Sequence, residues 1–151
     1  KSILDAHNNG TIIYGECGGM MYLLEKLIDC DGRSFNMCGV LSGSSRMENK
    51  RQGLGYVIAE ATYDSVICKR GDTFRAHEFH WSKLLDVPDD IVFAYKTRKS
   101  NGKQSGTDGI CRKNVLASYT HVHFSSNPEL AKNILSTMVK TSRNKLVAER
   151  Q

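Results

Sequence analysis

Apolar residues near the N-terminus change from strand-like to helix-like spacing within a few positions. Residues 11–14 form a short apolar run that is typical of a buried strand. From residue 20 to residue 28 the apolar positions recur at helical spacing, which predicts a helix that runs to Asp29. A glycine-rich turn, residues 15–19, lies between the two. Residues 3–10 are typical of the end of another helix, so the chain is predicted to begin with helix, strand, turn and helix.

The middle of the chain is rich in short runs with strand character. Residues 69–72 are typical of a hairpin turn, and we expect them to join the strands on either side. The stretch from residue 98 to residue 109 carries three glycines among polar residues and is predicted to be a mobile surface loop. The predicted strands of this region are residues 40–41, 55–59, 65–68, 73–81, 91–95 and 115–119.

A helix start follows the last predicted strand. Ser126 and Asn127 are capping residues, Pro128 suits the first helical position, and Glu129 places an acid in the first turn. The amphipathic helix continues through Leu130, Ile134, Leu135, Met138 and Val139. With no internal repeat and no linker, the pattern predicts a single α/β domain.

Composition narrows the class of protein. The 151 residues are 40% hydrophobic and 25% charged, which excludes a disordered or collagen-like chain, and the length fits one domain. No apolar run approaches the ~18 residues of a membrane span, and the first residues lack the apolar block of a secretory signal. The five cysteines are widely and irregularly spaced, which favours neither a disulfide framework nor a zinc ribbon. We therefore expect a cytoplasmic protein with no membrane partner.

The chain carries 21 Lys and Arg residues against 16 acids, a net charge of +5, which raises nucleic acid as a partner. The basic residues are concentrated at 96–103, 112–113 and 140–150 and are not interleaved with aromatic residues as they are on a base-stacking surface. A solvated basic rim is the preferred interpretation, and we expect no nucleic acid partner. A nucleic-acid-binding module stays open on net charge alone.

The pattern Gly15-x-Cys17-x-Gly19 between strand and helix has the form of a nucleophile elbow. Such a turn projects the nucleophile into a cleft, and the backbone N–H groups from Gly18 onward can face a developing oxyanion. The start of the helix would also favour a thiolate. A buried structural cysteine beside a glycine-rich turn is the alternative.

Four histidines fall in two short motifs, His77 and His80 in the first, His121 and His123 in the second. The second motif directly follows a strand. If that strand runs parallel to the one before Cys17, His121 stands at the same sheet edge, where a general base for the thiol is needed. A His-x-His pair can also hold a metal, but no recognised ligand spacing is present, so we predict no metal site.

The motifs together closely resemble the glutaminase domain of the cobyrinic acid a,c-diamide synthase family. They occur in the family's order and span most of the chain; they are Tyr14–Leu23, Gly55–Tyr56, Ala76–Ser82, Ala117–Phe124 and Ser126–Pro128. The resemblance implies a class I glutamine amidotransferase-like (flavodoxin-like) fold, three layers around a central, mostly parallel sheet, here without the family's first strand. It also implies that glutamine is hydrolysed through a cysteine thioester to release ammonia.

The resemblance places Cys17 at the nucleophile position and His121 at the position of the histidine that activates it. Many type 1 amidotransferases carry an orienting glutamate two residues after that histidine, where this chain has His123. A Cys-His dyad is therefore expected, with Glu78 as a candidate stand-in. Gly18 is the one oxyanion donor that the motif supplies. Tyr56, His77, Glu78, His80 and His123 are candidates for contacts to substrate or to another domain.

The family's full enzymes carry an N-terminal synthetase domain that binds ATP and Mg and amidates a tetrapyrrole. Because this chain has no phosphate-binding glycine loop, we expect a C-terminal fragment with no cofactor of its own, whose partners are glutamine and, through that domain, ATP and the tetrapyrrole. The nickel-tetrapyrrole a,c-diamide synthase of methanogens has the same kind of glutaminase and is the nearest alternative. A cysteine hydrolase of similar fold is a more distant one, and a homodimer is left open.

Overall fold

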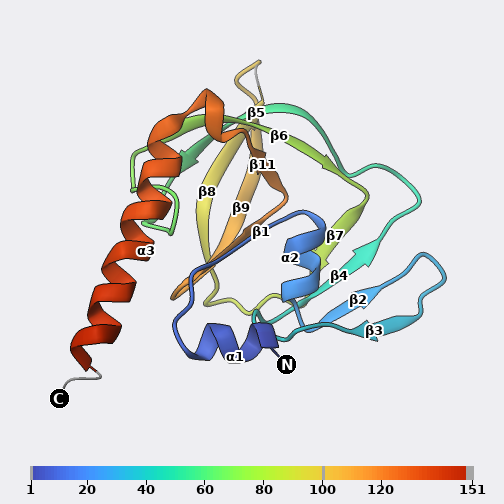
Figure 1. The fold of residues 1–151 in the computed structure, drawn as a ribbon. Coiled ribbons are helices and arrows are strands. Elements are labelled where there is room, and N and C mark those ends of the chain that lie inside the picture. The colour runs from blue at the N-terminus through green and yellow to red at the C-terminus, as the bar shows by residue number, and fades with distance from the viewer. Residues whose placement is uncertain (1, 100, 149–151) are drawn as a thin grey trace.

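The computed structural model describes residues 2–99 and 101–148. It contains two β-sheets, and helices lie on both faces of the larger sheet (Figure 1). The helices are α1 (Ser2–Asn8), α2 (Gly18–Leu23), the short 3-10 helix η1 (Phe124–Ser126) and α3 (Pro128–Ala148). The strands are β1 (Ile13–Glu16), β2 (Lys26–Ile28), β3 (Ser34–Asn36), β4 (Ser44–Met47), β5 (Gly53–Ala61), β6 (Thr73–His80), β7 (Ser82–Leu85), β8 (Val92–Lys99), β9 (Gln104–Arg112), β10 (Val115–Ser118) and β11 (Thr120–Val122).

The large sheet has seven strands in the order β1-β10-β9-β8-β5-β6-β11. Strand β1 pairs in parallel with β10, so the condition stated for the strands before Cys17 and His121 is met. The other neighbours are antiparallel, so the expectation of a mostly parallel sheet was wrong. Short connections explain two of these pairs, because a parallel pair needs a crossover of a dozen or more residues, whereas β8-β9 and β9-β10 are joined by short turns.

A smaller sheet, β3-β2-β4-β7, continues from the end of β6. The helix that was predicted to run to Asp29 ends at Leu23, and the residues after it enter this smaller sheet. Leu24 is extended, with φ −69° and ψ 178°, and the Leu23 carbonyl accepts the N–H groups of Val40 and Leu41 in place of a next helical turn. Strand β2 then pairs with β4, so tertiary hydrogen bonding overrides the helical spacing.

Three other predicted segments also differ from the structure. Residues 65–68 form a buried turn in which the Cys68 N–H donates to the Ser65 hydroxyl, so β6 pairs with β5 instead of with this segment. Residues 40–41 are buried but not in a strand. The predicted loop at 98–109 is mostly the hairpin of β8 and β9. Many residues of this hairpin are polar because it is exposed to solvent. The alternation of apolar and polar residues by which a strand is predicted is therefore missing.

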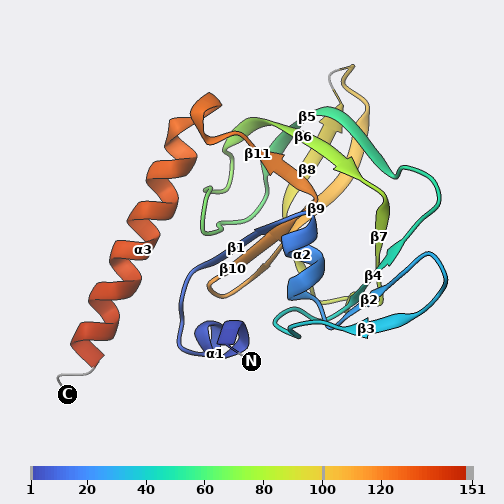
Figure 2. The ribbon, with the colours of Figure 1, turned by 45° about the vertical axis from the view of Figure 1, so that its right-hand side comes forward.

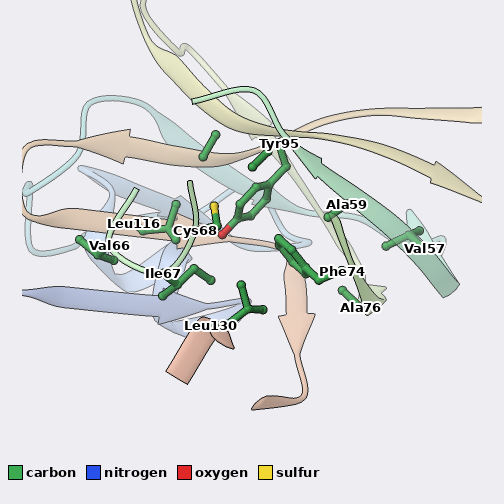
Figure 3. Close-up of a cluster of buried hydrophobic side chains, with 12 residues drawn as sticks. Val57, Ala59, Val66, Ile67, Cys68, Phe74, Ala76, Tyr95, Leu116 and Leu130 are labelled. Atoms are coloured by element: carbon green, nitrogen blue, oxygen red, sulfur yellow. The ribbon is translucent and has the colours of Figure 1, made fainter. Parts of the chain in front are cut away.

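Buried side chains form one cluster on each face of the large sheet, which gives three layers. One cluster includes Leu130 of α3, and the other includes Met20 of α2. Helix α3 lies on one side of the large sheet, and α1 and α2 lie on the other (Figure 2). Tyr95 sits within the first cluster, with its ring at 5.3 Å from Phe74 in an edge-on arrangement and its hydroxyl pointing toward Cys68 (Figure 3). Gly109 makes room for it, since an added Cβ would lie 2.7 Å from the Tyr95 ring.

Helix α3 begins where the sequence predicted. The Asn127 side chain caps it by accepting the Glu129 N–H at 3.2 Å. Leu130 is buried against the sheet, whereas Leu135, Met138 and Val139 are exposed, so α3 packs mainly through its first turns. Among the described helices, none is long and apolar enough to cross a membrane.

Candidate active site

Cys17 occupies the sharp turn between β1 and α2. Its backbone has φ 49° and ψ −105°, a conformation that residues other than glycine rarely adopt. The Cys17 N–H donates to the Ser118 carbonyl at 2.8 Å, and its own carbonyl accepts the Met21 N–H and starts α2. Gly15 is sterically required, since an added Cβ would lie 3.1 Å from the Gly19 backbone and 2.9 Å from Leu23 Cδ1. The predicted strand, elbow and helix are all present.

The Cys17 thiol is half-buried and lies against β6. Its Sγ–H donates to the Phe79 carbonyl at 3.7 Å. Partial burial raises the pKa of Cys17, the Gly18 backbone amide acts in the opposite direction, and the carboxylates of Glu16 and Asp108 raise the pKa further. The turn alone therefore leaves the sulfur as a thiol, and a base is needed to make it a nucleophile.

His121 lies on β11, which is at the opposite end of the large sheet from β1. Its Nδ1 is 3.4 Å from Oε2 of Glu16, the residue directly before Cys17. The other oxygen of that carboxylate accepts the Val122 N–H at 2.7 Å and the Tyr14 hydroxyl at 2.6 Å. The end of β1 is thereby joined to β11, which brings the histidine segment to the residue directly before the cysteine.

A second carboxylate, Asp108 of β9, fixes the bend between β10 and β11. It is buried and accepts the backbone N–H groups of Tyr119 and Thr120 at 3.1 Å and 2.7 Å, together with the Thr120 hydroxyl at 2.5 Å. Sequence reasoning did not single out this residue, because it lies in the stretch predicted to be a loop. Asp108 and Glu16 hold opposite ends of the four-residue segment that includes His121.

Tyr56, His77 and His123 lie beside His121 in an open groove of about 1050 Å³. Tyr56 on β5 and His77 on β6 are cross-strand partners, their rings 5.2 Å apart, and His77 is in turn the partner of His121. Tyr56 is 75% exposed. Three of the candidate contact residues thus share one surface with the candidate base.

Glu78 and His80 are placed differently. Glu78 follows His77 on β6, so its side chain points to the other face of the strand, away from His121; burial raises the pKa of its carboxyl. His80 stacks on Tyr119 at 3.8 Å and donates its Nδ1–H to the Ser82 carbonyl at 2.9 Å. Gly53 leaves the room for that ring, since an added Cβ would lie 2.3 Å from its Nε2.

The other four cysteines are also free thiols, with Cys68 buried and Cys30 exposed. Within residues 2–99 and 101–148, no three His, Cys, Asp or Glu side chains converge as metal ligands would.

Comparison with known proteins bears on this arrangement. Residues 1–129 match the model of the CobB/CobQ-like glutamine amidotransferase domain. The chain belongs to this family. It is 44% identical to a cobyrinate a,c-diamide synthase of Methanothermobacter thermautotrophicus over 88% of this chain and 28% of that protein. It is 42% identical to the enzyme of the same name from Methanocaldococcus jannaschii over 82% of this chain and 27% of the relative.

The fold agrees with family membership. A crystal structure of a glutamine amidotransferase superimposes on the chain with a TM-score of 0.61, covering 89% of this chain and 65% of that one at 15% identity. The class I amidotransferase-like fold is therefore confirmed, although the sheet is mostly antiparallel in the described residues. The family assignment makes the chain a glutamine amidotransferase domain, and the chain spans little more than a quarter of the relatives' length.

Proposed function

We propose that this chain hydrolyses glutamine through a thioester on Cys17, and that the ammonia serves ATP-dependent amidation of the a and c carboxylates of cobyrinic acid. The observation that carries the proposal is the position of the Cys17 elbow: its N–H donates to the carbonyl of Ser118, three residues before His121, and the adjacent Glu16 carboxylate lies 3.4 Å from the His121 ring. The family assignment supplies glutamine as the substrate class, and the relatives' name supplies the acceptor.

We assign the steps of this reaction to Cys17, His121 and the Gly18 N–H. His121 takes the Cys17 thiol proton, and the thiolate attacks the carboxamide carbon of glutamine. The Gly18 N–H donates to the oxyanion that forms. Collapse of this intermediate breaks the C–N bond, and His121 returns the proton to the departing ammonia. Water then attacks the γ-glutamyl thioester with His121 as general base, releasing glutamate and restoring the thiol.

The remaining parts of the enzyme are proposed to lie outside this chain. ATP, Mg and the tetrapyrrole would bind a synthetase domain, consistent with relatives more than three times as long. The Phe79 carbonyl accepts from the thiol, and Phe79, its strand partner Leu54 and nearby Trp81 are 41–49% exposed, a patch of the kind that another domain covers. We propose that this patch and the groove beside His121 face that domain. The free thiols suit the reducing cytoplasm in which we place the reaction.

Labelling with 6-diazo-5-oxo-norleucine tests the glutaminase proposal. This glutamine analogue should alkylate Cys17 in preference to the other four cysteines, as read by intact mass and peptide mapping. Glutamine should protect Cys17, and Cys17→Ser should abolish labelling. Equal labelling of all five cysteines would contradict a glutamine site and favour a cysteine hydrolase of similar fold. Supplying the full-length enzyme with cobyrinic acid or the nickel tetrapyrrole would distinguish the two acceptors.

A further inference from the structure

We propose that Glu16 is the positioning residue for His121, taking the place of the glutamate that this chain lacks at position 123. The inference rests on the proposed function and adds to it the group that orients the base. Glu16 Oε2 lies 3.4 Å from His121 Nδ1. A carboxylate at Nδ1 keeps the proton on that nitrogen and leaves Nε2 as the nitrogen that accepts the thiol proton.

The Glu16 carboxylate is held firmly enough for this role. Its Oε1 accepts hydrogen bonds from the Tyr14 hydroxyl and the Val122 N–H, at 2.6 Å and 2.7 Å. Burial, followed by the neighbouring Glu16 carboxylate, holds the pKa of Tyr14 far above its ordinary value, so Tyr14 remains a donor at any working pH. Both partners bind the same oxygen, and the second oxygen is left for His121. A separation of 3.4 Å is loose, as such contacts often are before substrate binds.

Competing carboxylates are placed less well. Glu78 points to the opposite face of β6 from His77, the strand partner of His121. Asp108 is engaged by Tyr119 and Thr120 and holds the backbone instead of the imidazole. Within the described residues, Glu16 is the only residue whose carboxylate lies within 4 Å of a His121 ring nitrogen.

The charged groups around His121 fix the expected sign of the pH dependence. Glu16 faces it from β1, His77 is its partner on β6, and His123 and Arg75 share the groove. Glu16 is the one anion among them, and an adjacent anion favours the charged imidazolium. Removing that anion should therefore move the acidic limb of the kcat/KM profile for glutamine to lower pH.

Glu16→Gln tests this role in the full-length enzyme. The glutamine retains an oxygen that can accept from Tyr14 and Val122, so the fold should persist, with an unchanged melting temperature as the check. We expect kcat/KM for glutamine to fall by roughly 10²- to 10⁴-fold, the range for loss of an orienting group, with the acidic limb moved to lower pH. Glu60→Gln, at an exposed position of β5, is the matched control and should leave both kcat/KM and the acidic limb unchanged.

Two results would overturn the proposal. One is a Glu16→Gln enzyme with kcat/KM within about threefold of wild type; the other is a loss of activity with the acidic limb in its original place, which would indicate a structural role only. A shift of the limb in Glu78→Gln but not in Glu16→Gln would assign the role to Glu78. Retained hydrolysis in Cys17→Ala would instead remove the proposed function itself, so the two failures are distinguishable. Tyr14→Phe, which keeps the charge, should lower kcat/KM less than Glu16→Gln does and leave the limb in place.

Discussion

Thr120 donates both its backbone N–H and its hydroxyl to one carboxylate, that of Asp108. The contact is buried and lies one residue before His121. Because the hydroxyl and the amide are fixed by the same group, the backbone at the start of β11 has a single orientation. The position of the candidate base therefore depends on a residue of another strand that does not touch the base.

Replacing Asp108 by Asn should destabilise the protein and reduce glutamine hydrolysis. The amide offers one acceptor oxygen where the carboxylate serves three donors, and in either orientation its NH₂ group would face a backbone N–H. We expect a loss of about 2–4 kcal/mol in the free energy of unfolding, measured by urea denaturation. Asp31→Asn, at an exposed ion pair with Arg33, should change it by less than about 1 kcal/mol. Equal effects of the two changes would contradict the structural role of Asp108.

Gly15 and Gly19 of the elbow should differ in how well the protein tolerates their replacement by alanine. In Gly15→Ala the new Cβ would meet Leu23 at 2.9 Å and the Gly19 backbone at 3.1 Å, which the turn cannot relieve without moving Cys17. We expect a lower melting temperature and a loss of 6-diazo-5-oxo-norleucine labelling. Gly19→Ala meets nothing within 4 Å and should retain both. Normal labelling in Gly15→Ala would show that the turn is less crowded than the structure indicates.

His121 on β11 and His123, directly after the end of β11, should differ in their contribution to glutamine hydrolysis. His121→Ala should lower kcat for glutamine by roughly 10²- to 10⁴-fold while circular dichroism stays native, because it removes the base. His123→Ala removes an exposed groove residue and should cost far less. If the His123 variant were inactive and the His121 variant active, the assignment of the base would be wrong.

Alkaline pH should weaken the fold through Cys68. Burial raises the pKa of this thiol to about 11, against 9.0 for an ordinary thiol. Between these values the folded state binds the proton that the unfolded state has lost, so stability is fully present below about pH 9 and falls as pH rises toward 11. The loss should reach about 2–3 kcal/mol. Urea unfolding at pH 8 and pH 10.5 measures it, and Cys68→Ser, which does not titrate in this range, should show a smaller difference.

The sequence predicted those parts of the site that depend on neighbouring residues. A strand, glycines and a helix around Cys17 are local, and so is the cap of α3 at Asn127. Glu16 and Asp108 could not be found in this way. Their partners lie on other strands, Val122 being 106 positions from Glu16, and the bend that turns the histidine segment toward β1 is set by the whole sheet. The antiparallel pairing of most strands could not be predicted either, because pairing depends on the lengths of the connections, which the apolar pattern of each strand does not determine.

Strands β1 and β11 are the first and last strands of the large sheet, yet the Glu16 carboxylate connects them. A folding intermediate that has formed only the β1 end of this sheet has Cys17 without its base. One that has formed only the β11 end has His121 without the nucleophile. Contacts of such long sequence separation form late in folding. Glutamine hydrolysis is therefore a stringent assay of complete folding, since nascent and partly unfolded chains should release no ammonia.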